Sequence, residues 1–355
     1  MFFKMGKLNN IAGNFIPEDN IIEIVPFGSG LINNTYLVKT KSSFPDYILQ
    51  RKNKNVFPNV PAMMDNIVKV TDHLRNKIIE EGGDPERNVM TLLTTTNGDP
   101  FFEDAEGEFW TMSLYIPDTI SYETASTNDL ARKGGEGIGK FQRQMADFTQ
   151  DLYLTIEGFH DLKFRFKQWD ETIKSGNRKR IKECKKEIEW IENRRKKMVD
   201  FWNLVEEGKI PKRVTHNDTK LSNILFDKEG NVLCVIDLDT VMYNTVLADF
   251  GDAIRTFANQ GKEDDINIDN VGLDIEKYNS YIEGYLSEAG EMLNEMEKEY
   301  LSFGPQYIIY EQVMRFLMDY LKDDVYYKID YPTHNLVRTR AQMKLLESIE
   351  SFFQI

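Results

Sequence analysis

The sequence predicts an α+β protein of two lobes, a small N-terminal lobe built on an antiparallel sheet and a larger, mostly helical C-terminal lobe. Three observations lead to this prediction. The chain has 355 residues, more than one typical hydrophobic core holds. Strand-like apolar runs separated by turn residues dominate the chain up to residue 117, and helical periodicity dominates the rest. We therefore predict lobes at residues 1–117 and 118–355.

Composition and charge restrict the class of partner. The net charge of −14 argues against general binding of nucleic acid, because phosphate contacts need a basic surface. Neither a secretory signal nor an apolar run of about 18 residues is present, so we expect a cytoplasmic protein without a membrane partner. The two cysteines do not form a disulfide framework, and the four histidines lack the spacing of zinc ligands. The oligomeric state does not follow from the sequence.

The first predicted element is a hairpin at residues 21–40, in which a glycine-containing bend separates two strands. Glycine lets backbone N–H groups approach phosphate oxygens closely, so the bend is a candidate phosphate loop. An ordinary hairpin turn is the alternative. The candidate nucleotide-binding residues of the bend are Gly28, Ser29, Gly30, Asn33 and Asn34.

A third strand at residues 47–51 is the expected location of a cation for the nucleotide phosphates. Gln50 occupies the position where Lys or Arg is expected, and we assign the contact to Arg51. A helix follows at residues 61–81, on which Asp65 is either the partner of that cation or a surface acid. Three apolar runs at residues 88–117 then complete a sheet of about five strands with one helix.

The C-terminal lobe contains long helical segments. Four closely spaced glycines in the helix at residues 127–153 predict close packing against another helix. The charged segment 174–198 is either a solvated helix face or a basic contact for an anionic partner. Near the C-terminus Glu311, Arg315 and Asp319 share one helix face, as either a surface salt-bridge ladder or part of a substrate pocket.

The polar loop and hairpin at residues 213–240 carry the most specific signal. A loop with the sequence HNDTKLSN precedes two short apolar strands joined by an Asp-Lys-Glu-Gly-Asn turn. Asp218, Asn223 and Asp237 stand at the mouth of this hairpin, Asp237 at the end of its second strand. D-x-x-x-x-N followed by a strand-terminal Asp is the catalytic pattern of protein-kinase-like folds. Side chains that only cap turns are the alternative.

This pattern meets the requirements of phosphoryl transfer. One carboxylate must orient the acceptor hydroxyl and take its proton, which we assign to Asp218. Oxygen ligands must hold Mg²⁺ on the phosphates of ATP, which we assign to Asn223 and Asp237. Tyr115 and Ile116, where the chain changes from strands to helices, would line the adenine slot. A DFG triplet, which holds the metal ligand in protein kinases, also occurs at residues 249–251. It does not end a strand, and Asp237 already supplies the strand-borne ligand, so we do not assign a metal-binding role to this triplet.

The residues resemble a known group, the aminoglycoside phosphotransferase/choline kinase superfamily. The segments "THNDTKLSNILFD" and "CVIDLDT" carry this likeness. Within the superfamily the chain is most similar to N-acetylhexosamine 1-kinases, on the segments "FGSGLINNTYLV", "YILQRKNKNVFPN", "IEGFHD", "FGDAIRTFAN", "RFLMDYLKDDVYYK" and "HNLVRTRAQ". The likeness covers nearly the full chain and implies the bilobal protein-kinase-like fold.

The resemblance implies an ATP- and Mg²⁺-dependent kinase that phosphorylates the anomeric hydroxyl of an N-acetylhexosamine (GlcNAc/GalNAc). It makes Asp218 the base, Asn223 and Asp237 the metal ligands, and places Arg315 and Asp319 beside the sugar. Asn217 stands where protein kinases have Arg, which argues against regulation through an activation-loop phosphate. Two alternatives stay open: a kinase of the same fold for choline, ethanolamine, homoserine or an aminoglycoside, and a catalytically inactive nucleotide-binding module.

Overall fold

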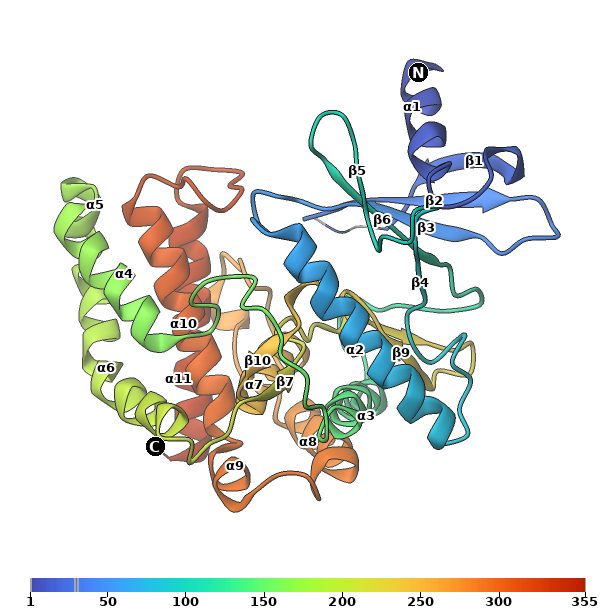
Figure 1. The fold of residues 1–355 in the computed structure, drawn as a ribbon. Coiled ribbons are helices and arrows are strands. Elements are labelled where there is room, and N and C mark those ends of the chain that lie inside the picture. Colours follow the sequence, from blue (N-terminus) through green and yellow to red (C-terminus); the bar gives the residue numbers. More distant parts are fainter. Residues whose placement is uncertain (1, 29, 31, 355) are drawn as a thin grey trace. The chain divides into compact units, whose positions relative to one another are not determined.

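The computed structural model describes residues 2–28, 30 and 32–354, which divide into two units (Figure 1). Unit 1 contains the chain as far as Ile120, together with Asp147–Glu157 and Leu225–Met242. Unit 2 contains Ser121–Ala146, Gly158–Ile224 and the chain from Tyr243 onward. An antiparallel sheet in unit 1 and a mostly helical unit 2 confirm the predicted α+β class. No helix in the described part of the chain is long and apolar enough to span a membrane.

The sheet of unit 1 has six antiparallel strands in the order β1-β2-β3-β6-β4, with β5 paired to β6. Two of them are only two residues long, so the predicted sheet of about five strands is close to the observed one. The strands are β1 (Ile21–Pro26), β2 (Asn34–Thr40), β3 (Tyr47–Arg51), β4 (Leu92–Leu93), β5 (Phe102–Glu103) and β6 (Phe109–Leu114).

Two helices accompany this sheet. Helix α1 (Phe2–Ala12), which the sequence patterns did not predict, contributes Ile11 and Ala12 to the apolar core beneath the strands. Helix α2 (Val60–Glu80) matches the predicted helix at 61–81 within one residue. It begins where expected because Asn59 caps its first turn by accepting a hydrogen bond from the Ala62 N–H, and a proline stands in that turn.

The predicted hairpin is present as β8 (Ile224–Phe226) and β9 (Val232–Val235). Its turn depends on Gly230, which has a φ of 80° that favours glycine. Most of the hairpin belongs to unit 1, although its residues fall within the predicted lobe 118–355. Hydrogen bonds explain this: Ile120 and Phe226 bond each other's backbone, and the Asn88 amide donates to the Leu233 carbonyl.

Unit 2 consists mainly of helices, with a short two-stranded sheet of β7 (Arg213–Thr215) and β10 (Met242–Asn244). Its 3-10 turns include η2 (Leu221–Asn223). The helices are α3 (Asn128–Gln144), α4 (Leu162–Ser175), α5 (Arg178–Glu183), α6 (Lys185–Glu206), α7 (Val246–Phe257), α8 (Ile275–Ala289), α9 (Glu295–Tyr300), α10 (Phe303–Leu321) and α11 (His334–Phe353).

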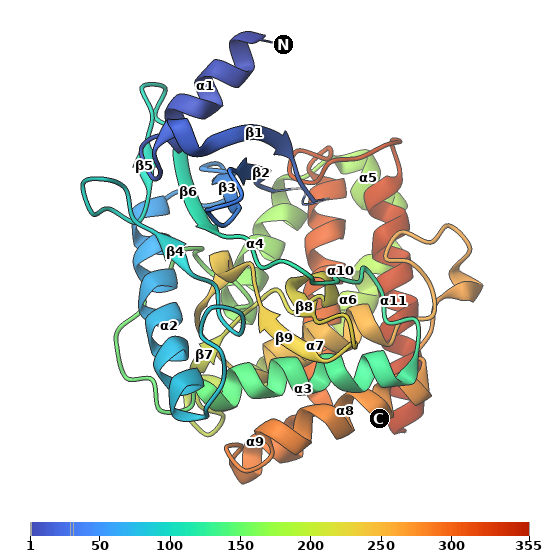
Figure 2. The same cartoon turned by 90° about the vertical axis from the view of Figure 1, so that its right-hand side faces the viewer.

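Helices α3 and α8 lie side by side in both views (Figure 2). A Cβ atom on Gly135 would lie 2.2 Å from the Tyr281 carbonyl oxygen, and one on Gly284 would lie 1.9 Å from the Arg132 carbonyl oxygen. Both distances are far inside van der Waals contact. The prediction that the clustered glycines allow close helix packing is therefore confirmed, although α3 ends at Gln144 rather than near residue 153.

Candidate phosphotransfer site

Asp218 lies in unit 2 on the loop between β7 and η2. Its side chain is 30% exposed, and Oδ2 accepts from Lys220 Nζ at 2.9 Å and from Asn223 Nδ2 at 3.2 Å. Asn223 also donates to the Asp218 carbonyl at 2.8 Å. Both of these side-chain bonds to Asp218 are on Oδ2. Sequence reasoning missed Lys220, although it stands two residues after the predicted base.

Buried side chains hold the backbone of this loop in place. Asp249, on α7, accepts the N–H groups of His216 at 2.9 Å and Asn217 at 2.6 Å. Asp252, one turn further along α7, accepts the Thr219 N–H at 3.0 Å. Asn217 adopts a φ of 66°, a left-handed conformation that costs free energy outside glycine and needs such support. Asp218 therefore sits on a constrained loop.

The electrostatics of these two acids differ. Burial raises the pKa of Asp249, and the N–H groups that it accepts from Gln142, Asn217 and His216 oppose this shift. Burial also acts on Asp252, but the adjacent Arg255 guanidinium outweighs it and lowers the pKa of this carboxyl. Asp252 is consequently a stable carboxylate acceptor for the loop.

Asp249 and Asp252 lie near the start of α7, where acids stabilise the helix dipole, and the sequence patterns indicate no further role for them. In the structure they are 0% and 5% exposed, and both face the loop at residues 216–220, the predicted catalytic loop, rather than solvent. The sequence contained one indication of this role, because both acids stand among mostly apolar residues of α7 and acids in such a helix need buried partners.

In unit 1 the buried cation is Lys52, directly after β3. Its Nζ lies 2.7 Å from Asp239 Oδ1 and 2.8 Å from Gln50 Oε1. Asn33 donates to the other carboxylate oxygen of Asp239 at 2.7 Å and accepts the Asn53 N–H at 3.1 Å. Lys52, one residue after Arg51, is thus a buried cation at the end of β3, and Gln50 is one of its partners.

The predicted cation Arg51 lies on the exposed side of the strand. Its guanidinium donates to Asn34 Oδ1 at 3.1 and 2.5 Å, because Asn34 is directly opposite it in the β2–β3 register. Asp65, the possible acidic partner from the helix, pairs instead with Lys69 at 2.7 Å. Arg51 is therefore exposed and Lys52 is buried, and the role of Arg51 as the nucleotide contact stays a prediction.

Other predicted nucleotide-binding residues follow β1 and β6 of the same sheet. Gly28 has a φ of 76° with open space around it, and Gly30 also has open space, whereas Ser29 falls outside the described residues. Ile116 is buried, and the ring of Tyr115 meets that of Phe27 edge-on at 5.8 Å. The loop after β1 and the segment after β6 therefore approach each other within unit 1.

Asp237 follows β9 after one residue and adopts a left-handed conformation with φ 62° and ψ 57°. Such a conformation in a residue other than glycine is often a sign of a functional constraint. Among the described residues no group of three or more His, Cys, Asp or Glu could hold a metal ion. The predicted ligands, one Asp and one Asn, do not make such a group, so their role stays a prediction.

The acidic and basic residues of α10 do not form a surface ladder. Glu311 is buried and pairs with His160 and Arg165 rather than with Arg315, whose guanidinium donates to Gln312 at 3.0 Å. Asp319 accepts three N–H groups from the chain itself, those of Tyr326 and Tyr327 and the Asn335 amide. It thereby fixes the segment that follows α10, and the salt-bridge-ladder alternative is wrong.

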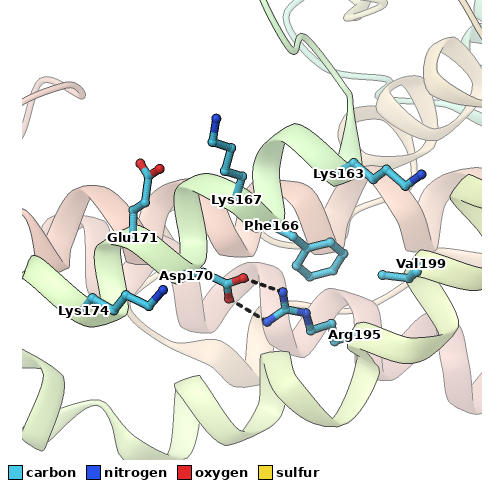
Figure 3. A pocket seen from close by; sticks show the side chains of 8 residues that line it. All are labelled: Lys163, Phe166, Lys167, Asp170, Glu171, Lys174, Arg195 and Val199. Atoms are coloured by element: carbon cyan, nitrogen blue, oxygen red, sulfur yellow. Dashed lines mark hydrogen bonds and ion pairs between the residues drawn. The ribbon is translucent and has the colours of Figure 1, made fainter.

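A surface depression of about 510 Å³ lies between α4 and α6 (Figure 3). Arg195 and Asp170 form a two-pronged ion pair in it at 2.7 and 2.8 Å, and the Arg195 guanidinium stands over the Phe166 ring. Both basic and acidic side chains line it. None of the predicted site residues lines it, so this depression is separate from the catalytic loop.

Solved structures with the same fold are phosphotransferases and kinases. A spectinomycin phosphotransferase in complex with ADP and spectinomycin has a TM-score of 0.60 at 13% identity, with 99% of both chains covered. A microcompartment-associated aminopropanol kinase has a TM-score of 0.64 at 14% identity, covering 98% of this chain and 97% of that one. The choline kinase of Streptococcus pneumoniae gives 0.56 at 12%, covering 98% and 99%. The predicted kinase-like fold is confirmed.

The sequence itself identifies the family. A model of the phosphotransferase enzyme family matches residues 23–270, well over half of the chain. The chain belongs to this family. The matched range contains both the catalytic loop with Asp218 and the Lys52–Asp239 pair.

Proposed function

We propose that this protein is an ATP- and Mg²⁺-dependent kinase that transfers the γ-phosphate to the anomeric hydroxyl of an N-acetylhexosamine, giving the sugar 1-phosphate. The observation that carries phosphoryl transfer is the constrained loop of Asp218, with one carboxylate oxygen paired to Lys220 and the other left for an acceptor. Membership of the phosphotransferase enzyme family supports it. The choice of sugar rests on the sequence resemblance.

Asp218 orients the acceptor hydroxyl and takes its proton. An anomeric hydroxyl is more acidic than an ordinary alcohol, so the carboxylate needs only to receive the proton late in the transfer. Lys220 keeps a positive charge within 2.9 Å of this carboxylate, where it can also stabilise charge that develops on the transferred phosphoryl group. Asp218 and Lys220 thus act on acceptor and donor respectively.

Asn223 and Asp237 are the residues that would hold Mg²⁺. Their donor chemistry fits, because Mg²⁺ prefers carboxylate and amide oxygens. Asn223 uses its amide nitrogen to bond Asp218, so its Oδ1 remains for a cation. When bound, the metal would neutralise charge on the phosphates of ATP.

Lys52 is our assignment for the α/β-phosphate contact, in place of the predicted Arg51. A buried ammonium held by Asp239 and Gln50 is fixed in position before nucleotide arrives, whereas Arg51 is exposed. The turn at Gly28 and Gly30 supplies backbone N–H groups for the remaining phosphate oxygens. Phe27 and Tyr115 provide an aromatic pair beside the adenine.

The charge around α10 favours a neutral acceptor over a cationic one. Arg165 and His160 pair with the same carboxylate, that of Glu311, and Arg315 is half-buried one turn further along α10, so basic groups outnumber the acid at this point. Choline or an aminoglycoside would require carboxylates or an aromatic cage instead. Asp319 supports the pocket indirectly by fixing the segment at Tyr326, and Arg315 is the candidate for direct contact with the sugar.

A screen of ATP-dependent phosphorylation tests the proposal with GlcNAc, GalNAc, choline, ethanolamine, homoserine and an aminoglycoside as acceptors. We expect turnover with the amino sugars and a product that is labile as an anomeric phosphate. Asp218→Asn should lower turnover by about 10³-fold while retaining ATP binding. Asp200→Asn, at an exposed acid in α6, is the matched control and should leave turnover unchanged. Near-normal turnover of Asp218→Asn would overturn the assignment of the base.

A further inference from the structure

We infer that His160 is a positioning residue of the transfer reaction, which fixes the peptide group in front of Asp218. The inference rests on the proposed function for its kinetic consequence. His160 stands at the start of the segment that leads into α4, far in sequence from the catalytic loop, and neither charge pattern nor spacing marked it as part of the site. Its ring is 7% exposed and lies entirely within unit 2.

The peptide bond between Asn217 and Asp218 is held from both ends by imidazole rings. His160 Nε2 lies 3.3 Å from the Asn217 carbonyl oxygen, and the Asp218 N–H donates to His216 Nδ1 at 3.3 Å. Asp249 holds the preceding N–H of Asn217, as described above. Rotation of this peptide group would swing the Asp218 side chain, so His160 restrains the direction in which the base points.

Both partners of the His160 ring are acceptors. Nδ1 lies 2.6 Å from Glu311 Oε2, and a carboxylate can only accept. Nε2 faces the Asn217 carbonyl, which can also only accept. The two ring nitrogens therefore connect Glu311 to the backbone in front of Asp218.

Glu311 is the acidic partner of His160 in the interior of unit 2. It is 1% exposed, and its other oxygen accepts from Arg165 at 2.9 and 3.1 Å. Burial would raise the pKa of Glu311, but its interactions with His160 and Arg165 outweigh burial and hold that pKa well below its usual range. Arg165, Glu311 and His160 thus form a chain of contacts that ends at the Asn217 carbonyl.

The backbone at His160 points to a role for the ring itself. Its φ of 53° is left-handed, a conformation in which histidine is found but which asparagine and glycine enter most routinely. Asparagine would therefore suffice for the bend alone. Its amide is too short to contact both Glu311 and the Asn217 carbonyl, whereas the two ring nitrogens of the imidazole contact both.

Two substitutions separate the two ring nitrogens. In His160→Asn the amide nitrogen takes the place of Nδ1 and can still donate to Glu311, but nothing reaches Asn217. In His160→Gln the longer amide takes the place of Nε2 and can still donate to the Asn217 carbonyl. A merely structural role predicts that His160→Asn is the milder variant, because asparagine tolerates the left-handed backbone better.

The inference predicts opposite orders for stability and catalysis. Thermal unfolding should show that His160→Asn is at least as stable as His160→Gln. Steady-state kinetics, with an acceptor that the wild-type protein phosphorylates, should show a kcat of His160→Asn lower than that of His160→Gln by roughly 10–100-fold, at similar KM for ATP. If kcat follows the order of thermal stability instead, with His160→Asn at least as active as His160→Gln, the inference is wrong.

A second measurement decides the inference without any acceptor. Hydrogen–deuterium exchange of the peptide that contains Asp218 reports the same peptide group, and it should be faster in His160→Asn than in His160→Gln. Equal exchange in the two variants would overturn the positioning role. Absence of sugar phosphorylation by the wild-type protein would instead overturn the proposed function and leave the exchange result to decide the role of His160.

Discussion

Removal of Lys52 should destabilise unit 1, because its ammonium group is the cation of a buried ion pair. The side chains of Lys52 and Asp239 are 4% and 5% exposed, and Nζ lies 2.7 Å from Oδ1. At an effective dielectric constant of about 20, this distance gives an attraction of about 6 kcal/mol before the desolvation cost. Lys52→Met would leave the Asp239 carboxylate buried without a cation, which costs about 3–5 kcal/mol of folding free energy.

Thermal unfolding followed by circular dichroism measures this cost. About 2–4 °C is lost per kcal/mol in a unit of this size, so the midpoint should fall by roughly 6–20 °C. Lys54→Met is the matched control, because Lys54 is 43% exposed and pairs with Glu108 on the surface, a contact worth at most about 1 kcal/mol. Lys52→Met combined with Asp239→Asn should recover part of the loss, since neither charge is then unpaired. Equal, small shifts for Lys52→Met and Lys54→Met would refute the reasoning.

Three other perturbations have consequences that the structure defines. Asp249→Asn should lower turnover by roughly 10–100-fold with little change in the KM for ATP, because an amide accepts through only one of its two positions; unchanged kinetics would show that the loop does not need this anchor. Gly135→Ala should lower the melting temperature, because its Cβ would lie 2.2 Å from the Tyr281 carbonyl oxygen and overpacking costs about 1–3 kcal/mol. Gly6→Ala, which meets open space in α1, is the control and should be neutral or stabilising. The lowered pKa of Glu311 means that its contribution to stability is complete above its ordinary value of 4.5 and is lost as the pH falls toward the folded-state value. Glu311→Gln should therefore flatten the acid side of a plot of melting temperature against pH, and parallel plots would contradict this.

Local pattern was sufficient for many of the helices and strands. Alternating apolar residues and turn chemistry predicted the hairpin after the loop, and helical spacing with Pro61 at the start predicted α2 within a residue. The clustered glycines of α3 correctly indicated close helix packing. These features depend on residues a few positions apart, which is the range over which backbone geometry and side-chain periodicity act.

The partners of the buried charges depend on the tertiary structure instead. Lys52 and Asp239 are 187 residues apart, and His160 and Glu311 are 151 apart. No local periodicity encodes such pairs, so Arg51, one residue away from the buried lysine, was an equally good choice from the sequence. The acids of α7 show the same limit. A favourable interaction with the helix dipole is enough to explain Asp249 near the start of α7, and only its burial shows that it has another role.

The sequence by itself therefore determined the family, the two-part architecture and the position of Asp218. Only the tertiary structure decided which cation is buried in unit 1 and which side chains restrain the peptide in front of Asp218. The physical reason is that a motif records the groups that react, whereas burial creates the need for partners: an ionised side chain in the interior must be paired, and folding brings that partner from a distant part of the chain.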